Sequence, residues 1–230
     1  MDYINFENIF SPPRIKRYVT ACNGNTRNAM VLYRKNLLLS QEFFTIISCF
    51  EISLRNRIDQ HFISTLGEDW LKASIELGGM FDQIHTKTTK KNIEDSLRKL
   101  NSNYSHNKLV AELGFGFWRY LFSKNQYRAT GKNLLKILPS KPISTSVCII
   151  NNTDIFNLLA KINDIRNRIA HHEPICFLPG KAIKCTNYTR QHYQMILTLF
   201  RWMEINESSL LYGLDRVLKI CDEIDRMKIG

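Results

Sequence analysis

The amino-acid sequence predicts an all-α fold, and three observations lead to this prediction. Apolar residues recur at the spacing of an α-helix through most of the 230 residues, and no segment shows the alternation of a β-strand. Only ten glycines and six prolines interrupt the chain, which leaves long stretches without a helix breaker. Hydrophobic residues make up 44% and charged residues 23%, as in folded globular proteins. At this length we expect residues 1–230 to form a single domain.

The first half of the chain is predicted to hold a short helix, a long helical segment and a basic helix. The triplet Ser11-Pro12-Pro13 predicts a short helix, because proline is tolerated in the first turn. From Thr26 to Ser64 apolar residues keep helical spacing, which predicts one long helix or two with a break near Ser40. A turn-rich segment over residues 67–79 follows, and residues 84–101 are predicted to form a basic amphipathic helix.

The second half is predicted to contain further helices and one long loop. Residues 109–125 are expected to form a single helical element. Residues 139–152 are rich in Ser, Thr, Pro and Asn, which predicts a long loop. Two helical stretches near the end of the chain, 189–204 and 208–227, complete the all-α prediction.

Between that loop and those stretches, the segment Asp154–His172 is predicted to be a helix. Thr153-Asp154 supplies an N-cap, and Pro174 should end the helix because the residue before proline avoids the α conformation. At about 100° per residue its apolar side chains form one stripe, and Arg166 falls inside that stripe. The stripe consists of Ile155, Leu158, Leu159, Ile162, Ile165 and Ile169.

An arginine in an apolar stripe needs a carboxylate, a subunit interface or an anion-binding cleft, because burying an unpaired guanidinium is costly. Two interpretations stay open. In the first, Arg166 faces an anion, and His171 and His172 project from the last turn for acid–base work. In the second, Arg166 bonds a buried acid such as Glu51, and the histidines only cap the helix.

The formal net charge of +11 indicates a polyanionic partner. Nucleic acid is favoured over a membrane surface, because the basic residues are scattered along the chain instead of lying on one amphipathic segment. A merely well-solvated basic surface is the alternative. The chain starts Met1-Asp2-Tyr3-Ile4-Asn5 and has only short apolar runs, so we expect neither a signal peptide nor a transmembrane helix.

The cysteines show no Cys-x-x-Cys pair, and we expect reduced thiols in a cytoplasmic protein. They are Cys22, Cys49, Cys148, Cys176, Cys185 and Cys221. His171, His172, Cys176, Cys185 and His192 lie in one short stretch, but no paired ligand spacing accompanies them. We therefore expect no metal and no cofactor.

The segment Arg166-Asn167-Arg168-Ile169-Ala170-His171 has the form Arg-Asn-x-x-x-His, which resembles the Arg-x4-6-His signature of HEPN ribonucleases. Two further blocks, from Leu32-Tyr33-Arg34-Lys35-Asn36 through Phe50–Ile58 and over Leu113–Phe122, are similar to the AbiD/AbiF-type abortive-infection family. With Arg166–Ile175 as the third block, the resemblance covers most of the chain.

The resemblance implies a HEPN-like helical bundle with helical additions, which dimerises and cleaves RNA in antiphage defence without a metal ion. Arg166 would stabilise the phosphate, His171 would move protons, Asn167 would orient the pair, and His172 is the alternative proton carrier. Arg168, Lys161, Lys181 and Lys184 are expected to bind RNA. Some relatives act with a small non-coding RNA. One class of HEPN toxins is silenced at a Tyr two positions after the motif His, where this chain has Glu173.

Two alternatives accompany this prediction. A catalytically inactive motif would have the same sequence pattern. The chain could therefore hold a small RNA without cutting it, or act in a toxin–antitoxin pair. The motif is also partly repeated earlier in the chain, since Leu54–His61 resembles Ile165–His172. We expect Glu51, Arg55 and Asn56 there to be supporting residues, with Glu51 and Arg55 paired at i,i+4. A second catalytic motif is the other possibility.

An aromatic run over residues 115–122 has two interpretations as well. Its members are Phe115, Phe117, Trp118, Tyr120 and Phe122. They could stack on nucleobases, but their crowding with aliphatic residues favours core packing.

Overall fold

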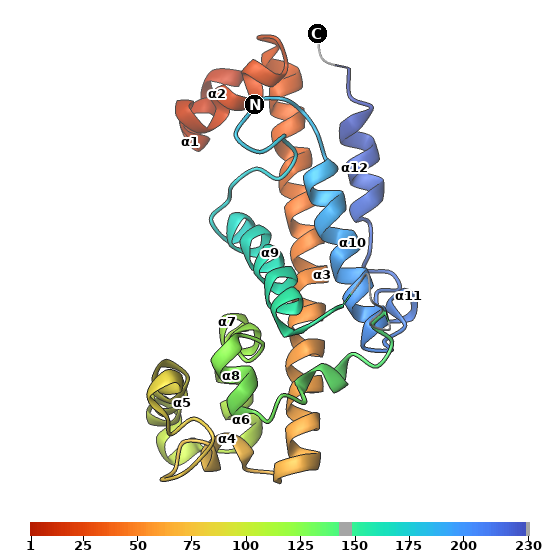
Figure 1. Cartoon of the computed structure of the whole chain (residues 1–230). Helices are drawn as coiled ribbons and strands as arrows, with labels where there is room; N and C mark the ends of the chain where they lie inside the picture. The colour runs from red at the N-terminus through yellow and green to blue at the C-terminus, as the bar shows by residue number, and fades with distance from the viewer. Residues whose placement is uncertain (143–148, 229–230) are drawn as a thin grey trace. The chain divides into compact units, whose positions relative to one another are not determined.

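The computed structural model describes residues 1–142 and 149–228, and within them the fold is all-α, as predicted (Figure 1). An isolated antiparallel bridge between Phe177 and Lys184 is the one β pairing in the described residues. The chain divides into two compact units. The first comprises residues 1–48, 164–197 and 208–230, and the second comprises residues 49–163 and 198–207. That the whole chain forms a single domain stays a prediction.

The N-terminal helices are α1 (Tyr3–Phe10), α2 (Pro12–Ala21) and α3 (Thr26–Leu66). α2 begins at the predicted proline pair, and α3 runs without a break, so the single-helix alternative is confirmed. α1 was not predicted. Asp2 caps it by accepting a hydrogen bond from the backbone N–H of Asn5 at 2.8 Å.

The middle of the chain folds into short helices and turns, with one longer helix. They are α4 (Trp70–Ala73), η1 (Ile84–Thr86), α5 (Lys87–Leu100), η2 (Asn101–Asn103), α6 (His106–Glu112), α7 (Phe115–Tyr120), α8 (Lys124–Ala129) and η3 (Leu134–Ile137). The basic helix predicted over residues 84–101 is confirmed. The single element predicted over residues 109–125 is wrong, because the backbone becomes extended at Gly114 and again at Ser123. The indole of Trp118 supports the first break by donating to the carbonyl of Leu113 at 2.9 Å.

The remaining helices are α9 (Asn152–Ala170), α10 (Asn187–Trp202), α11 (Glu207–Leu210) and α12 (Val217–Asp225). The N-cap of α9 is Asn151, whose side chain accepts from the N–H groups of Thr153 at 2.7 Å and Asp154 at 3.2 Å, so the predicted cap is corrected. The helix predicted over 208–227 is interrupted after Leu210, where Gly213 takes a φ of 76°. In the predicted 139–152 loop, residues 139–142 and 149–151 are not helical, and residues 143–148, with Cys148, lie outside the described part.

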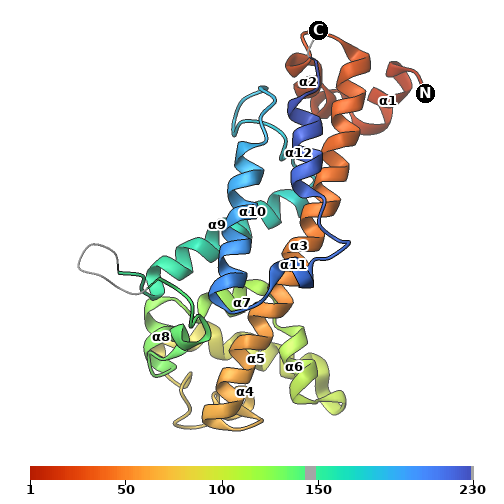
Figure 2. The same cartoon turned by 90° about the vertical axis from the view of Figure 1, so that its right-hand side faces the viewer.

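The first unit is built on the first part of α3, which lies beside α12, and on α10, which also lies beside α12 (Figures 1 and 2). Ion pairs join these helices, with Lys35 Nζ 2.7 Å from Glu223 and Arg190 Nη2 2.6 Å from Asp222. Aromatic side chains of α1, α2 and α3 pack against one another. Phe6, Tyr18 and Tyr33 are all buried, and the ring centroids of Tyr18 and Tyr33 are 5.0 Å apart.

The second unit packs around the last part of α3. The rings of Phe62 and Trp70 are 4.5 Å apart at their centroids, and the Trp118 centroid is 6.5 Å from that of Trp70. Buried Asp59 lies beside them and accepts hydrogen bonds from Trp70 Nε1 and His106 Nε2, each at 2.8 Å. A buried carboxylate is stable only with such partners.

Among the described residues, α3 alone is long and apolar enough to cross a membrane by length and composition. An 18-residue window of it has a mean hydropathy of 1.4, and 33% of that window is buried. The core helix of a soluble protein meets the same criterion. A location in the cytoplasm therefore stays a prediction.

Candidate active site

α9 ends at Ala170 in a Schellman motif, within the first unit. The backbone N–H of Glu173 donates to the carbonyl of Arg168 at 2.8 Å, and the N–H of His172 donates to Ile169 at 2.9 Å. His172 has a φ of 56°, the left-handed conformation that this motif needs. Its side chain and that of His171 therefore leave from the cap and not from the last helical turn, which corrects the predicted end at His172.

Two arginines hold this cap in place. Arg14 of α2 donates from Nη1 to the carbonyl of His172 at 2.8 Å. Arg168 reaches over the cap and donates to the carbonyl of Pro174 at 2.7 Å and to the carboxylate of Glu173 at 3.3 Å. The guanidinium of Arg168 also lies 4.9 Å from the ring centre of Tyr188. Because Arg168 is occupied by these contacts, its place in the structure suits a positioning residue.

Asn36 of α3 fixes the segment that follows the cap. Its side-chain oxygen accepts from the backbone N–H groups of Ile175 at 2.9 Å and Cys176 at 3.3 Å, and all three residues are buried. Thr189 donates to the Ile175 carbonyl at 2.7 Å. Burial raises the pKa of the Cys176 thiol, which keeps it protonated and unreactive.

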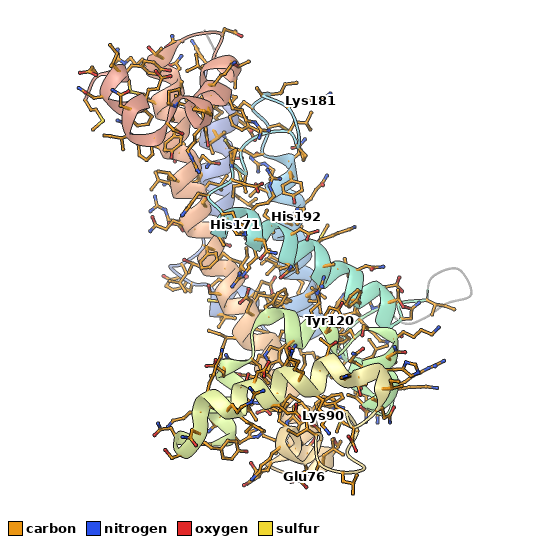
Figure 3. The ribbon with its side chains drawn as sticks, turned by 90° about the vertical axis from the view of Figure 1, so that its left-hand side faces the viewer. Glu76, Lys90, Tyr120, His171, Lys181 and His192 are labelled. Atoms are coloured by element: carbon orange, nitrogen blue, oxygen red, sulfur yellow. The ribbon has the colours of Figure 1, made fainter. Side chains whose placement is uncertain are left out.

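The side chains of the motif differ in exposure. Arg166 is half-buried beside the buried stripe residues Ile162, Ile165 and Ile169, and its Nη1 lies 3.5 Å from the Asn167 side-chain oxygen. His171 and His172 are exposed, and Figure 3 shows His171 at the C-terminal end of α9. One end of a helix thus carries a guanidinium and two accessible imidazoles, which is the chemistry needed to bind a phosphate and to move protons.

The lysines predicted to bind RNA have different surroundings. Lys181 is exposed in the loop between α9 and α10, and Lys161 is exposed in α9 but belongs to the second unit. Lys184 is half-buried, and its ammonium donates to the carbonyls of Ile224, Asp225 and Met227 at 2.7–2.9 Å. Burial lowers the pKa of Lys184. This lysine caps the C-terminus of α12, which leaves Lys181 as the accessible cation of the loop.

The predicted supporting residues Glu51, Arg55 and Asn56 lie in the part of α3 that belongs to the second unit. Glu51 and Arg55 are half-buried, and Arg55 Nε donates to the Asn56 side chain at 3.4 Å. A bond between Glu51 and Arg166 stays a prediction, as does an i,i+4 pair of Glu51 with Arg55.

The short stretch considered for zinc is split between exposed and buried positions. His171 and His172 are exposed, whereas Cys176 and His192 are buried. Throughout the described residues, no three His, Cys, Asp or Glu side chains gather closely enough to hold a metal ion.

Sequence reasoning missed Arg14 and Asn36 as parts of the site. Arg14 is one of many basic residues of the chain, and its partner His172 is 158 positions away in the sequence. Asn36 carried a signal, since it is a lone amide on the buried side of a long apolar helix, and such a group must find a hydrogen-bond partner.

A model of the family described as Abi-like protein matches residues 3–176. The matched range begins at α1 and ends six residues after Ala170, so it includes the motif, its cap and Asn36. Neither the curated proteins nor the solved structures gave a match.

Proposed function

Because this chain belongs to the Abi-like protein family, whose name points to abortive infection of phage-infected cells, we propose that it is a metal-independent endoribonuclease. Its active site would contain Arg166, Asn167, His171 and His172. The observation that carries this proposal is the fixed helix end, where a Schellman cap, Arg14 and Asn36 hold two exposed imidazoles within six residues of a half-buried guanidinium.

The chemistry follows from these groups. The 2′-hydroxyl of RNA attacks the adjacent phosphorus and loses its proton to a base, while the P–O5′ bond breaks and the leaving oxygen gains a proton from an acid. His171 serves as the base or the acid, and Arg166 offsets the negative charge that develops on the phosphorane. Products carry a 2′,3′-cyclic phosphate and a 5′-hydroxyl. A single chain supplies few groups for both proton transfers, so a second copy is expected to complete the cleft.

The first unit has a surface suited to such a homodimer. Four apolar side chains of α3 in this unit, Val31, Leu37, Leu38 and Phe44, are between 37% and 51% exposed and fall on one half of the helix. Several exposed apolar side chains on one side of a helix suit an interaction surface. Apolar association would cover them and would also place two motifs in one particle.

We predict that light scattering at micromolar concentration shows a dimer and that Leu38→Glu produces a monomer that no longer cuts RNA. Leu77→Glu is the matched control, because Leu77 is 100% exposed and belongs to the other unit. A monomeric Leu38→Glu variant that cuts RNA at the wild-type rate would contradict the shared cleft.

The experiment that tests the proposed activity is incubation of the purified chain with total RNA and with a defined transcript, beside Arg166→Ala. We expect cleavage by the wild type that survives EDTA, and products with 5′-hydroxyl ends in mass spectrometry. RNA with a 2′-deoxy sugar immediately 5′ of the scissile phosphate should be bound but not cut, since phosphate contacts dominate affinity. 5′-phosphate ends, or activity lost with EDTA and restored by magnesium, would contradict the mechanism. Intact RNA that is nevertheless bound would favour a silent RNA-binding module.

A further inference from the structure

A cavity in the second unit contains none of the residues assigned to cleavage. Its volume is about 670 Å³, within the range of small-molecule sites. Residues of η1, α5, α7 and α8 line it, among them His85, Asn92, Arg119, Tyr120 and Lys124. All of these belong to the same compact unit.

The lining of this cavity is positively charged. Arg119 and Lys124 contribute two cations, and none of its lining residues is an Asp or Glu. The guanidinium of Arg119 lies 5.5 Å from the ring centre of Tyr120 and 4.8 Å from that of Phe156. Its Nε is buried and has no hydrogen-bond partner in the described residues. A buried donor without an acceptor is unfavourable, and an anion close to the guanidinium would stabilise its charge.

An accessible aromatic ring lies beside these cations. Of the aromatic run over residues 115–122, Phe115, Phe117, Trp118 and Phe122 are buried, so core packing is confirmed for them. Tyr120 is different, because it is 48% exposed and lines the cavity. Its ring meets Phe156 edge-on, at 5.6 Å and 88°, which fixes its orientation. An ordered, half-exposed ring can stack on a nucleobase.

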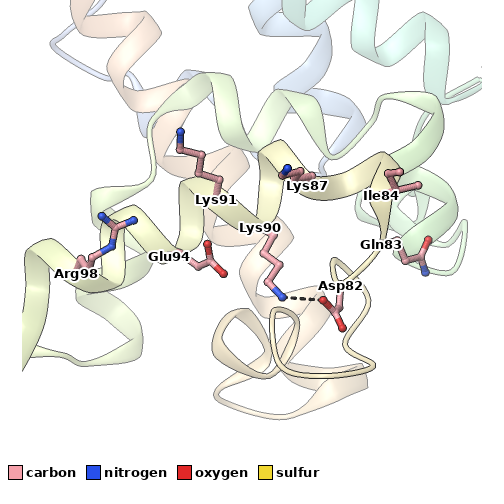
Figure 4. Close-up of a pocket in the computed structure, with 8 residues that line it drawn as sticks. All are labelled: Asp82, Gln83, Ile84, Lys87, Lys90, Lys91, Glu94 and Arg98. Atoms are coloured by element: carbon pink, nitrogen blue, oxygen red, sulfur yellow. Dashed lines mark hydrogen bonds and ion pairs between the residues drawn. The ribbon is translucent and has the colours of Figure 1, made fainter.

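Unpaired lysines extend the positive charge along α5 beyond the cavity. Lys90 is bound to Asp82 at 2.7 Å, whereas Lys87 and Lys91 have no acidic partner among the described residues (Figure 4). Lys91 precedes Asn92 of the cavity, and Figure 4 shows its side chain extending away from the Lys90–Asp82 pair. Lysines without an acidic partner suit a ligand that carries more than one phosphate. A base of such a ligand can stack on an aromatic ring only when its strand is unpaired.

We propose that this cavity binds one nucleotide of a single-stranded RNA, with the base on Tyr120 and a neighbouring phosphate on Arg119 and Lys124. The choice of RNA as the strand rests on the proposed function, whereas the recognition of an unpaired nucleotide rests on the cavity itself. The chain then holds RNA at a place in the second unit while the cleavage motif belongs to the first.

The test measures fluorescence anisotropy of a short unstructured RNA, labelled with fluorescein, against the full chain carrying His171→Ala so that the probe is not cut. Tyr120→Ala should weaken binding about fivefold or more, the usual loss of a stacked base, and Tyr120→Phe should retain affinity. Lys124→Ala should reduce the slope of log affinity against log salt by about 0.7, the value for one single-strand phosphate contact. Lys108→Ala, an exposed lysine of α6 outside the cavity, is the matched control.

Unchanged affinity in both Tyr120→Ala and Lys124→Ala, with both variants folded by circular dichroism, would overturn the proposal. If a nucleoside monophosphate binds as tightly as the RNA, with the same dependence on Tyr120, the proposal of a single-stranded RNA is wrong and the ligand is a free nucleotide. Cleavage is measured separately on the wild type. Loss of affinity in Tyr120→Ala without any cleavage by the wild type would support the cavity while contradicting the ribonuclease.

Discussion

The sequence Arg-Asn-Arg-Ile occurs twice, at Arg55–Ile58 and at Arg166–Ile169, and a histidine follows each copy. The first copy lies inside α3, which continues to Leu66, and belongs to the second unit. The second copy lies at the end of α9 and belongs to the first unit. The same four residues therefore occur once in the middle of a helix and once directly before a cap.

The histidines after the two copies have different partners. His61 is half-buried, and its Nε2 lies 3.0 Å from the side-chain oxygen of Asn133. His171 is exposed, and no described residue forms a hydrogen bond with its ring. At the position directly after each Arg-Asn-Arg-Ile copy, Asp59 is buried and bonded to Trp70, whereas Ala170 is exposed. The first copy therefore has the contacts of a structural element, whereas the histidine after the second copy is accessible to solvent, as the proposed function requires.

The largest expected effect separates the two histidines. We predict that His171→Ala lowers the rate of RNA cleavage by about 100-fold or more, as expected for the loss of a general acid or base. His61→Ala should retain most of the activity, because its ring already bonds Asn133. Rates on one RNA substrate measure both. Equal losses in two folded variants would show that the first copy is also catalytic.

The long helices of both copies were predictable from sequence because their signal is local. Apolar spacing gave α3 and α9, and the basic amphipathic pattern gave α5. The errors lie where a specific side-chain contact, and not the apolar spacing, determines the backbone. The break before α7 depends on the Trp118 indole bonding to the Leu113 carbonyl, and α1 depends on Phe6 packing on Tyr33 at 5.4 Å. Neither contact leaves a periodic pattern.

The motif of the candidate site was also visible in sequence, but the groups that fix it were not. Arg166 and His171 were found from a helix wheel and a short motif. Arg14 and Asn36 bind backbone groups 158 and 139 positions away, and a backbone carbonyl or N–H has the same identity at every position. For the same reason the sequence did not predict that Lys181 is accessible while Lys184 is half-buried. The ammonium of Lys184 is held by three backbone carbonyls at the end of α12.

A second prediction sharpens the comparison through stability. Asp59→Ala should lower the free energy of unfolding by about 3 kcal/mol, because it leaves the Trp70 and His106 donors buried without their acceptor. Ala170→Ser changes the aligned position, which is exposed, and should shift the free energy of unfolding by no more than about 0.5 kcal/mol. Urea unfolding followed by circular dichroism measures both. A small loss in Asp59→Ala would mean that the first copy is not a structural centre.

The smallest expected effect concerns the second arginine of each copy. Arg168 bonds the Pro174 carbonyl and Glu173 and lies over Tyr188, whereas Arg57 is exposed and has no bonding partner in the described residues. Arg168→Ala should therefore lower the free energy of unfolding by about 1–2 kcal/mol, and Arg57→Ala should change it by no more than about 0.5 kcal/mol.

Arg168→Ala also distinguishes a positioning role of Arg168 from direct RNA contact. If Arg168 holds the cap, Arg168→Ala loses stability and cleavage rate while the salt dependence of RNA binding is unchanged. If its guanidinium binds a phosphate, stability is retained and the slope of log affinity against log salt falls by about 0.7. Because the Pro174 bond at 2.7 Å and the Glu173 contact both close the cap, we expect the first result. Arg168→Lys should behave like Arg168→Ala, since an ammonium cannot reproduce the planar contacts of a guanidinium.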